Sequence, residues 1–202
     1  MTSSQKIMKK KGRFKAEIDS RLPENQSDAL WQKASDRLAA LLDQYASLPQ
    51  GVRFHMENKI LPAAAIYLTL KESIGQPEAY RVMEDATFKT ADAAAKKLSP
   101  LLRLPGIRSL FVKMWAPLTR KMFGENSGFQ NVFYPKKKGE YRMDVVSCPY
   151  NRYFTELGCP EITKISCGAD DHVYGDLPGL KFERTSTIGR GGERCDFCIR
   201  KI

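Results

Sequence analysis

Residues 129–147, FQNVFYPKKKGEYRMDVVS, decide the fold of this 202-residue chain, because the spacing of apolar residues changes here from helical to strand-like. From Tyr141 onward, side chains destined for a core alternate with others, the pattern of a strand with one buried face. Pro135 and Gly139 enclose three lysines, a composition typical of a short connection. We therefore predict a hairpin of two strands, 129–134 and 140–147.

The residues before this hairpin have the spacing of helices. Apolar residues recur at helical intervals from Ser27, a candidate N-cap, until Pro49 ends the pattern. Two further helices are predicted to end near Gly75 and Leu98, and a fourth is predicted over 106–123.

After the hairpin, two short helices are expected at 149–157 and 160–171, because each begins with a proline. Two more strands are predicted at 179–187 and 194–200, separated by the loop Gly189–Gly192. The sequence thus predicts an α+β fold, with N-terminal helices packed on a small antiparallel sheet that carries a two-helix insertion. We expect a single domain over 26–202, mainly helical in 26–125, with strands and short helices in 126–202.

The net charge of +10 is concentrated in two runs, residues 6–15 and Lys136–Lys138. Neither run is interleaved with aromatic residues or followed by a nucleic-acid motif, so we interpret residues 1–25 as a flexible, solvated basic arm and expect no nucleic-acid partner. A basic interaction protein that uses residues 6–15 is kept as an alternative.

The predicted helix at 106–123 combines a broad apolar stripe with Arg108, Lys113, Arg120 and Lys121. Packing against the core is the common fate of such a stripe, and we favour it, while binding to a membrane surface stays an alternative.

The chain has five cysteines, an odd number, and no apolar segment typical of export or of a membrane span. We therefore expect a cytoplasmic protein whose cysteines are reduced thiols, metal ligands or reactive groups.

Cys148 is a candidate nucleophile or metal ligand, because it follows a strand and precedes Pro149. At the start of a helix, backbone N–H groups and the helix dipole lower the pKa of a thiol. A buried structural role is weighed equally, because cysteine is among the most buried residues.

Cys167, Asp170 and Asp171 lie at positions i, i+3 and i+4, so a helix would place them on one face. Such a set can bind a metal or a cationic group of a substrate, and His172 follows it. The alternative is solvated aspartates at a helix end with Cys167 in the core.

Cys195 and Cys198 form a single CxxC, which is weak evidence for zinc. In a strand the two side chains would point to opposite faces, which separates them further. Arg184, in the predicted strand, has the chemistry to bind a carboxylate, or alternatively to pair with Glu183 or Asp196.

Several short motifs occur in one order and together resemble a known family, the L-2-amino-thiazoline-4-carboxylic acid hydrolases. They are Cys148-Pro149-Tyr150, Pro160-Glu161, Cys167 with Asp170 or Asp171, Phe182-x-Arg184-Thr185-x-Thr187 and Gly191-Gly192-x-x-Cys195-Asp196-Phe197. The resemblance covers about residues 140–200.

This resemblance implies a hydrolase acting on carbon–nitrogen bonds in cyclic amidines, which attacks the C=N carbon of a small substrate that carries a carboxylate. The implied catalytic residues are Cys148, Cys167, Asp170, Asp171 and Cys195. Among these, Cys148 or Cys195 is the expected nucleophile and Asp170 or Asp171 the base or amidine partner. The implied substrate-binding residues are Arg184, as carboxylate anchor, Tyr150 and His172.

The same cysteines also loosely resemble those of vinyl-reductase-like sensor domains, which implies a non-catalytic binding module. In that interpretation Cys148, Cys167 and Cys195 hold a divalent metal, zinc or manganese, with an aspartate or Cys198 as fourth ligand.

Overall fold

A computed structural model describes residues 1–202 and confirms the α+β fold. The predicted hairpin is present: β1 (Gln130–Phe133) pairs antiparallel with β2 (Glu140–Ser147). β4 (Cys195–Lys201) pairs with the other side of β2, and β3 (Leu180–Glu183) forms the far edge, so the order of strands is β1-β2-β4-β3.

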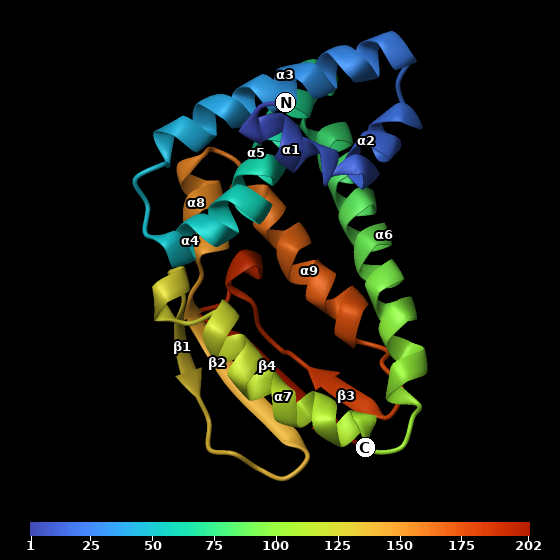
Figure 1. The fold of residues 1–202 in the computed structure, drawn as a ribbon, viewed down its shortest axis with the longest axis vertical. Coiled ribbons are helices and arrows are strands. Elements are labelled where there is room, and N and C mark those ends of the chain that lie inside the picture. The colour runs from blue at the N-terminus through green and yellow to red at the C-terminus, as the bar shows by residue number, and fades with distance from the viewer.

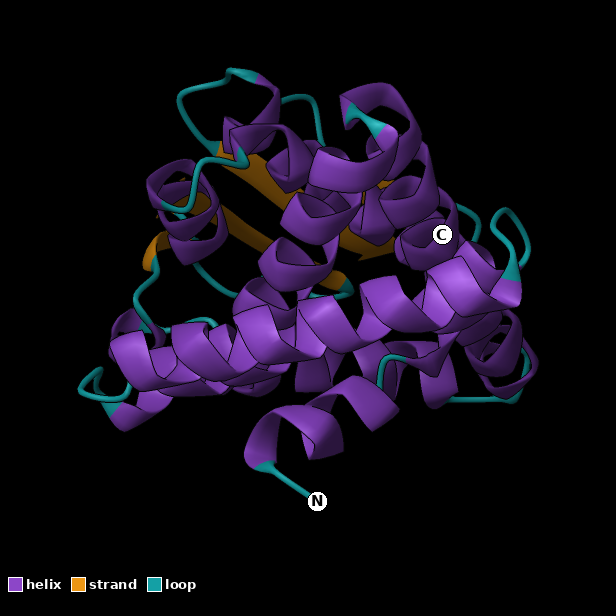
Figure 2. Cartoon of the chain, turned by 90° about the horizontal axis from the view of Figure 1, so that it is seen from above, coloured by secondary structure: helices purple, strands orange, loops and turns teal.

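The helices lie beside this sheet, except that the helix at residues 107–122 packs on it (Figures 1 and 2). They are α1 (Ser3–Lys9), α2 (Gly12–Asp19), α3 (Glu24–Gln44), α4 (Gln50–His55), α5 (Leu61–Ile74), α6 (Gln76–Leu102), α7 (Ile107–Met122), α8 (Pro149–Glu156) and α9 (Thr163–Tyr174). A π-helical turn, Met56–Ile60, joins α4 to α5, and single 3₁₀ turns lie at Glu125–Ser127, Pro160–Ile162 and Ile188–Arg190. No helix combines the length and apolar character needed to cross a bilayer.

The inner face of the sheet forms one of two hydrophobic cores. Its register places Met143 opposite Phe197 and Val145 opposite Cys195, so these side chains point to the same side. Trp115 of α7 stacks on Phe197 at 6.0 Å between ring centroids, and Tyr174 at the end of α9 meets the same ring edge-on. The predicted core packing of residues 106–123 is thus confirmed for the inward side of α7.

The prediction of a flexible arm at residues 1–25 is wrong, because α1 and α2 are docked on the helical layer. Met8 and Ile18 are buried in the helical core, and Thr2 and Gln5 form a capping box at the start of α1. Ser27 is not the N-cap of the next helix: α3 begins three residues earlier, and the Ser27 hydroxyl donates a hydrogen bond to Asp19.

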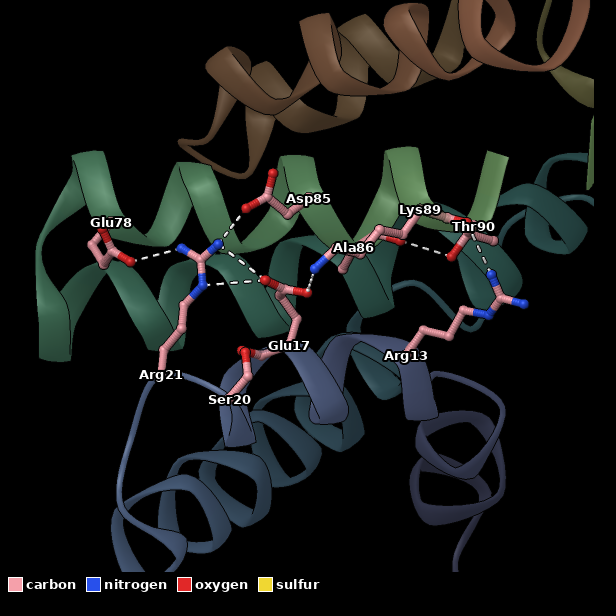
Figure 3. A network of polar contacts seen from close by, with 9 residues as sticks. All are labelled: Arg13, Glu17, Ser20, Arg21, Glu78, Asp85, Ala86, Lys89 and Thr90. Atoms are coloured by element: carbon pink, nitrogen blue, oxygen red, sulfur yellow. Dashed lines mark hydrogen bonds and ion pairs between the residues drawn. The ribbon is translucent and has the colours of Figure 1, made fainter. Parts of the chain in front are cut away.

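Ion pairs hold α2 against α6 (Figure 3). The carboxylate of Glu17 accepts hydrogen bonds from Arg21 and Lys89, and Arg21 also pairs with Glu78 and Asp85. Because Glu17 is buried, these cations are what makes its charge tolerable there.

Lys11 also has a structural role that its place in a basic run does not reveal. The ammonium group of Lys11 donates to the carbonyl of Asn58, in the π-helical turn before α5, at 2.6 Å. Burial lowers the pKa of Lys11 to about 8. The lysine therefore connects the N-terminal segment to the π-helical turn between α4 and α5.

Candidate functional site

The motif residues come together where α8, α9 and β4 meet. Figure 1 shows the segment between β3 and β4, in red, reaching from the sheet toward α9. Strand β3 ends at Glu183, earlier than the predicted 187, because the Asp196 side chain accepts hydrogen bonds from the backbone N–H groups of Thr185 and Ser186. The captured segment leaves the sheet and passes over the thiols.

Cys167 is the thiol that this environment activates. A hydrogen bond from Cys195 is the largest cause, and with the positive charge of Arg184 it lowers the pKa of Cys167 to about 7, against the opposing effect of burial. The Thr187 hydroxyl and the N–H of Gly189 also stabilise the thiolate. The Thr187 hydroxyl is buried and has no other hydrogen-bond partner in the structure.

Gly189 lets the backbone approach this sulfur. A Cβ at position 189 would lie 2.8 Å from the Sγ of Cys167 and 2.8 Å from the Cγ2 of Thr163, closer than such atoms can stand. The loop that the sequence suggests is a plain hairpin turn is therefore part of the site, and it folds as a 3₁₀ turn against α9.

Cys195 and Cys148 lie beside Cys167, but the pKa values of their thiols are raised rather than lowered. Cys195 donates to Cys167 and receives the N–H of Ile188 at 3.3 Å, and its own pKa is raised. Cys148 is the N-cap of α8, as predicted, and the N–H groups of Tyr150 and Asn151 act on its sulfur. Burial outweighs them and raises the pKa of Cys148 to about 11, so the prediction of an acidic thiol at this N-cap is wrong.

Arg184 is almost fully buried and all of its strong contacts are internal. It donates to the Asp170 carboxylate at 3.0 Å, to the Asp171 carboxylate at 2.6 Å and to the Cys167 carbonyl at 2.7 Å. With its donors turned toward α9, it is not placed to anchor the carboxylate of a substrate. It instead fixes the two aspartates and adds positive charge next to Cys167.

The two aspartates differ in how many of their carboxylate oxygens are free of hydrogen-bond partners. Both oxygens of Asp171 are occupied, one by Arg184 and the other by Arg190 at 2.9 Å. Asp170 uses only Oδ2, and 45% of its side chain is accessible. Desolvation nevertheless raises the pKa of Asp170 to about 6, even with Arg184 opposing. Its Oδ1 has no partner within the protein and is therefore available to a ligand.

Tyr150 lies near Cys148 and Asp170: burial is the main reason that the pKa of its hydroxyl is raised, and the charges of these two residues raise it further. The hydroxyl lies 3.2 Å from Nδ1 of His55, a histidine of the helical layer whose Nε2 lies 2.7 Å from the carbonyl of Met122. Since Nε2 must donate to that carbonyl, Nδ1 accepts from Tyr150. Burial lowers the pKa of His55 and keeps it neutral.

His172, predicted to bind substrate, points away from the thiols. Its Nδ1 lies 2.8 Å from a carboxylate oxygen of Asp92, and its ring stacks on Phe88 at 4.0 Å, both on α6. The structure therefore separates His172 from the residues that converge.

No group of three or more histidine, cysteine, aspartate and glutamate side chains is placed to hold a metal ion. The sulfurs of the three converging cysteines interact with backbone N–H groups and with one another. Cys198 lies apart from them, since its side chain points to the opposite face of β4 from that of Phe197. The residues present thus do not fit the zinc or manganese site considered above.

Comparison with known proteins bears on the same segment. Searches of curated proteins and of solved structures found no match to this chain. A model of the family described as L-2-amino-thiazoline-4-carboxylic acid hydrolase matches residues 53–199, which include His55, all three converging cysteines and the loop at Gly189. The chain therefore belongs to the L-2-amino-thiazoline-4-carboxylic acid hydrolase family.

Proposed function

We propose that this protein is a hydrolase that opens the ring of a 2-amino-thiazoline carboxylate or a closely related cyclic amidine, with Cys167 as the nucleophile. The observation that carries the proposal is the setting of Cys167: the Gly189 backbone comes so close that a Cβ there would lie 2.8 Å from the sulfur, and Arg184 donates to the carbonyl of the same cysteine at 2.7 Å. The lowered pKa of Cys167 agrees with this setting, whereas burial raises the pKa of Cys148. A thiolate available at neutral pH is the group that such a reaction requires.

The chemistry proceeds in two stages. The Cys167 thiolate attacks C2 of the amidine, and the bond from C2 to the ring sulfur breaks, which leaves an open-chain isothiourea on the enzyme. Water then attacks the same carbon and the Cys167 thiolate leaves, so the product is a ureido acid with a free thiol. One proton of the water ends on the former ring sulfur and the other on the former ring nitrogen.

Asp170 is the group that we assign to the amidine and to the attacking water. Its Oδ1 is free and accessible, so it can accept an N–H of the amidine and, in the second stage, a proton of the water. Asp171 has no free oxygen, and its role is to hold Arg184 and Arg190.

For the substrate carboxylate, Arg190 replaces Arg184 as the proposed anchor. Arg190 is exposed and donates one amino group to Asp171, which leaves its other N–H donors free for a ligand. It stands next to Gly189 in the turn that stabilises the Cys167 thiolate.

Turnover of 2-amino-thiazoline-4-carboxylate, followed by mass spectrometry of the ureido product, tests the proposal. Cys167→Ser is expected to lose about 10³-fold or more in kcat, as removal of a nucleophile does. Cys198→Ser, on the other face of β4, is the matched control and is expected to keep its activity. Activity of Cys167→Ser equal to that of the control would refute the assignment.

A further inference from the structure

The outward face of α7 is apolar where a helix facing water is ordinarily polar. Leu110, Met114, Leu118 and Met122 follow one another at intervals of four residues, and each is between 43% and 51% exposed. The opposite side of the helix is already packed, with Val112 buried and Trp115 on the sheet. The exposed stripe is therefore additional to the apolar surface that the fold needs.

Cations accompany this stripe without any acidic residue. Residues 101–124 hold Arg103, Arg108, Lys113, Arg120 and Lys121, with no aspartate or glutamate among them. None of the five is in an ion pair. Along the chain, the last lysine or arginine before this segment that forms an ion pair is Lys89, and the first one after it is Lys137. At about 100° per residue, Lys121 points within about 20° of Leu110 and of Met114, so positive charge lies within the apolar stripe itself.

We propose that this face of α7 binds the surface of a membrane that contains anionic lipids. The leucines and methionines would enter the boundary between headgroups and acyl chains, while the lysines extend to the phosphates. Leu104, exposed in the turn before α7, lengthens the apolar end of the same segment.

Charge argues against a second copy of the chain as the occupant. A symmetric dimer through this face would bring five cations against the same five, with no carboxylate from residues 101–124 to offset them. An anionic lipid surface supplies the missing negative charge along the whole length of the helix.

The test is co-sedimentation of the full chain with phosphatidylcholine vesicles, with and without phosphatidylglycerol, at low and at physiological ionic strength. Binding is expected only to the anionic vesicles and is expected to weaken with salt. Lys113→Gln/Lys121→Gln should weaken partitioning by about 25-fold, since each charge contributes about fivefold. Leu110→Ser/Leu118→Ser should weaken it by about tenfold or more.

The matched control is Lys9→Gln/Lys10→Gln, which removes the same charge from exposed positions at the C-terminal end of α1, at the other end of the molecule (Figure 1). We expect this control to bind within about threefold of wild type because charges beyond the contact are screened. An equal loss in the control and the α7 variants would overturn the proposal, as would an absence of binding to anionic vesicles. A dimer in sedimentation velocity that Leu110→Ser/Leu118→Ser dissociates would assign the face to a second copy instead.

Discussion

Removing the thiol of Cys195 should raise the pKa of Cys167, because the hydrogen bond from Cys195 is the largest cause of its low value. In wild type, with a pKa of about 7, about half of Cys167 is thiolate at pH 7. A thiol with the ordinary pKa of about 8.5 would be only about 3% thiolate at this pH. The structure therefore supplies about 15-fold more thiolate than an unassisted cysteine has.

This gain does not pass fully into reactivity, because a thiolate becomes a weaker nucleophile as its pKa falls. With a Brønsted coefficient of about 0.45, the intrinsic loss is about fivefold, so wild-type Cys167 should be alkylated only about threefold faster than an ordinary thiol at pH 7. The rate at a single pH is thus a poor test, whereas the midpoint of the pH profile measures the pKa directly.

We expect the rate of iodoacetamide alkylation of Cys167, followed by peptide mass spectrometry, to have a midpoint near pH 7 in wild type and at least about one unit higher in Cys195→Ala. Cys195→Ser, which keeps a donor at this position, should lie between the two. Cys198→Ala is the control and should match wild type. A midpoint that stays near 7 in Cys195→Ala, or one near 9 in wild type, would refute the reasoning.

Four further outcomes are expected. Gly189→Ala should raise the pKa of Cys167 and cut turnover by about tenfold or more, since its Cβ would force the loop away from the sulfur, while far-UV circular dichroism stays unchanged. The value of kcat/KM should rise with pH through about 6 and about 7, because Asp170 and Cys167 both act in their deprotonated forms. The site raises the pKa of Asp170 to about 6 and lowers that of Cys167 to about 7. A plateau already reached at pH 5 would contradict this. Met8→Ala should lower the free energy of unfolding by about 2–5 kcal/mol in urea titrations, while the exposed Met1→Ala should not change it. Dialysis against a chelator should leave turnover intact, and a loss that zinc restores would show that a metal site was missed.

The sequence predicts the strands and most helices well, because alternation in 140–147 and the prolines that open helices act locally. It fails at residues 1–25, where a basic run hides Met8 and Ile18. Only the folded chain shows that Lys11 of this segment donates to the carbonyl of Asn58, and that Glu17 of this segment accepts a hydrogen bond from Lys89 on α6. Charge density alone does not distinguish a solvated arm from a docked one.

In the site, sequence reasoning finds the converging residues but not their roles. Cys148 sits at the predicted N-cap, yet the sequence does not state how deeply a thiol is buried, and burial decides its pKa. Arg184 has the chemistry of a carboxylate anchor, but the nearest carboxylates are the protein's own.

Thr187 and Gly189 were absent from the candidate site, because Thr187 falls within the predicted strand and Gly189 within the predicted turn. The signal that would have found them is the side chain of Asp196, a residue type that often binds backbone N–H groups and so interrupts a neighbouring strand.

The most direct test of the central claim is to trap the enzyme during a single turnover of 2-amino-thiazoline-4-carboxylate. Rapid acid quench and peptide mass spectrometry should find the peptide that contains Cys167 heavier by the whole mass of the substrate, since ring opening on the sulfur loses no atom. The adduct should be absent in Cys167→Ser. Turnover with no adduct, or with the added mass on Cys148 or Cys195, would contradict the assignment of Cys167 as the nucleophile.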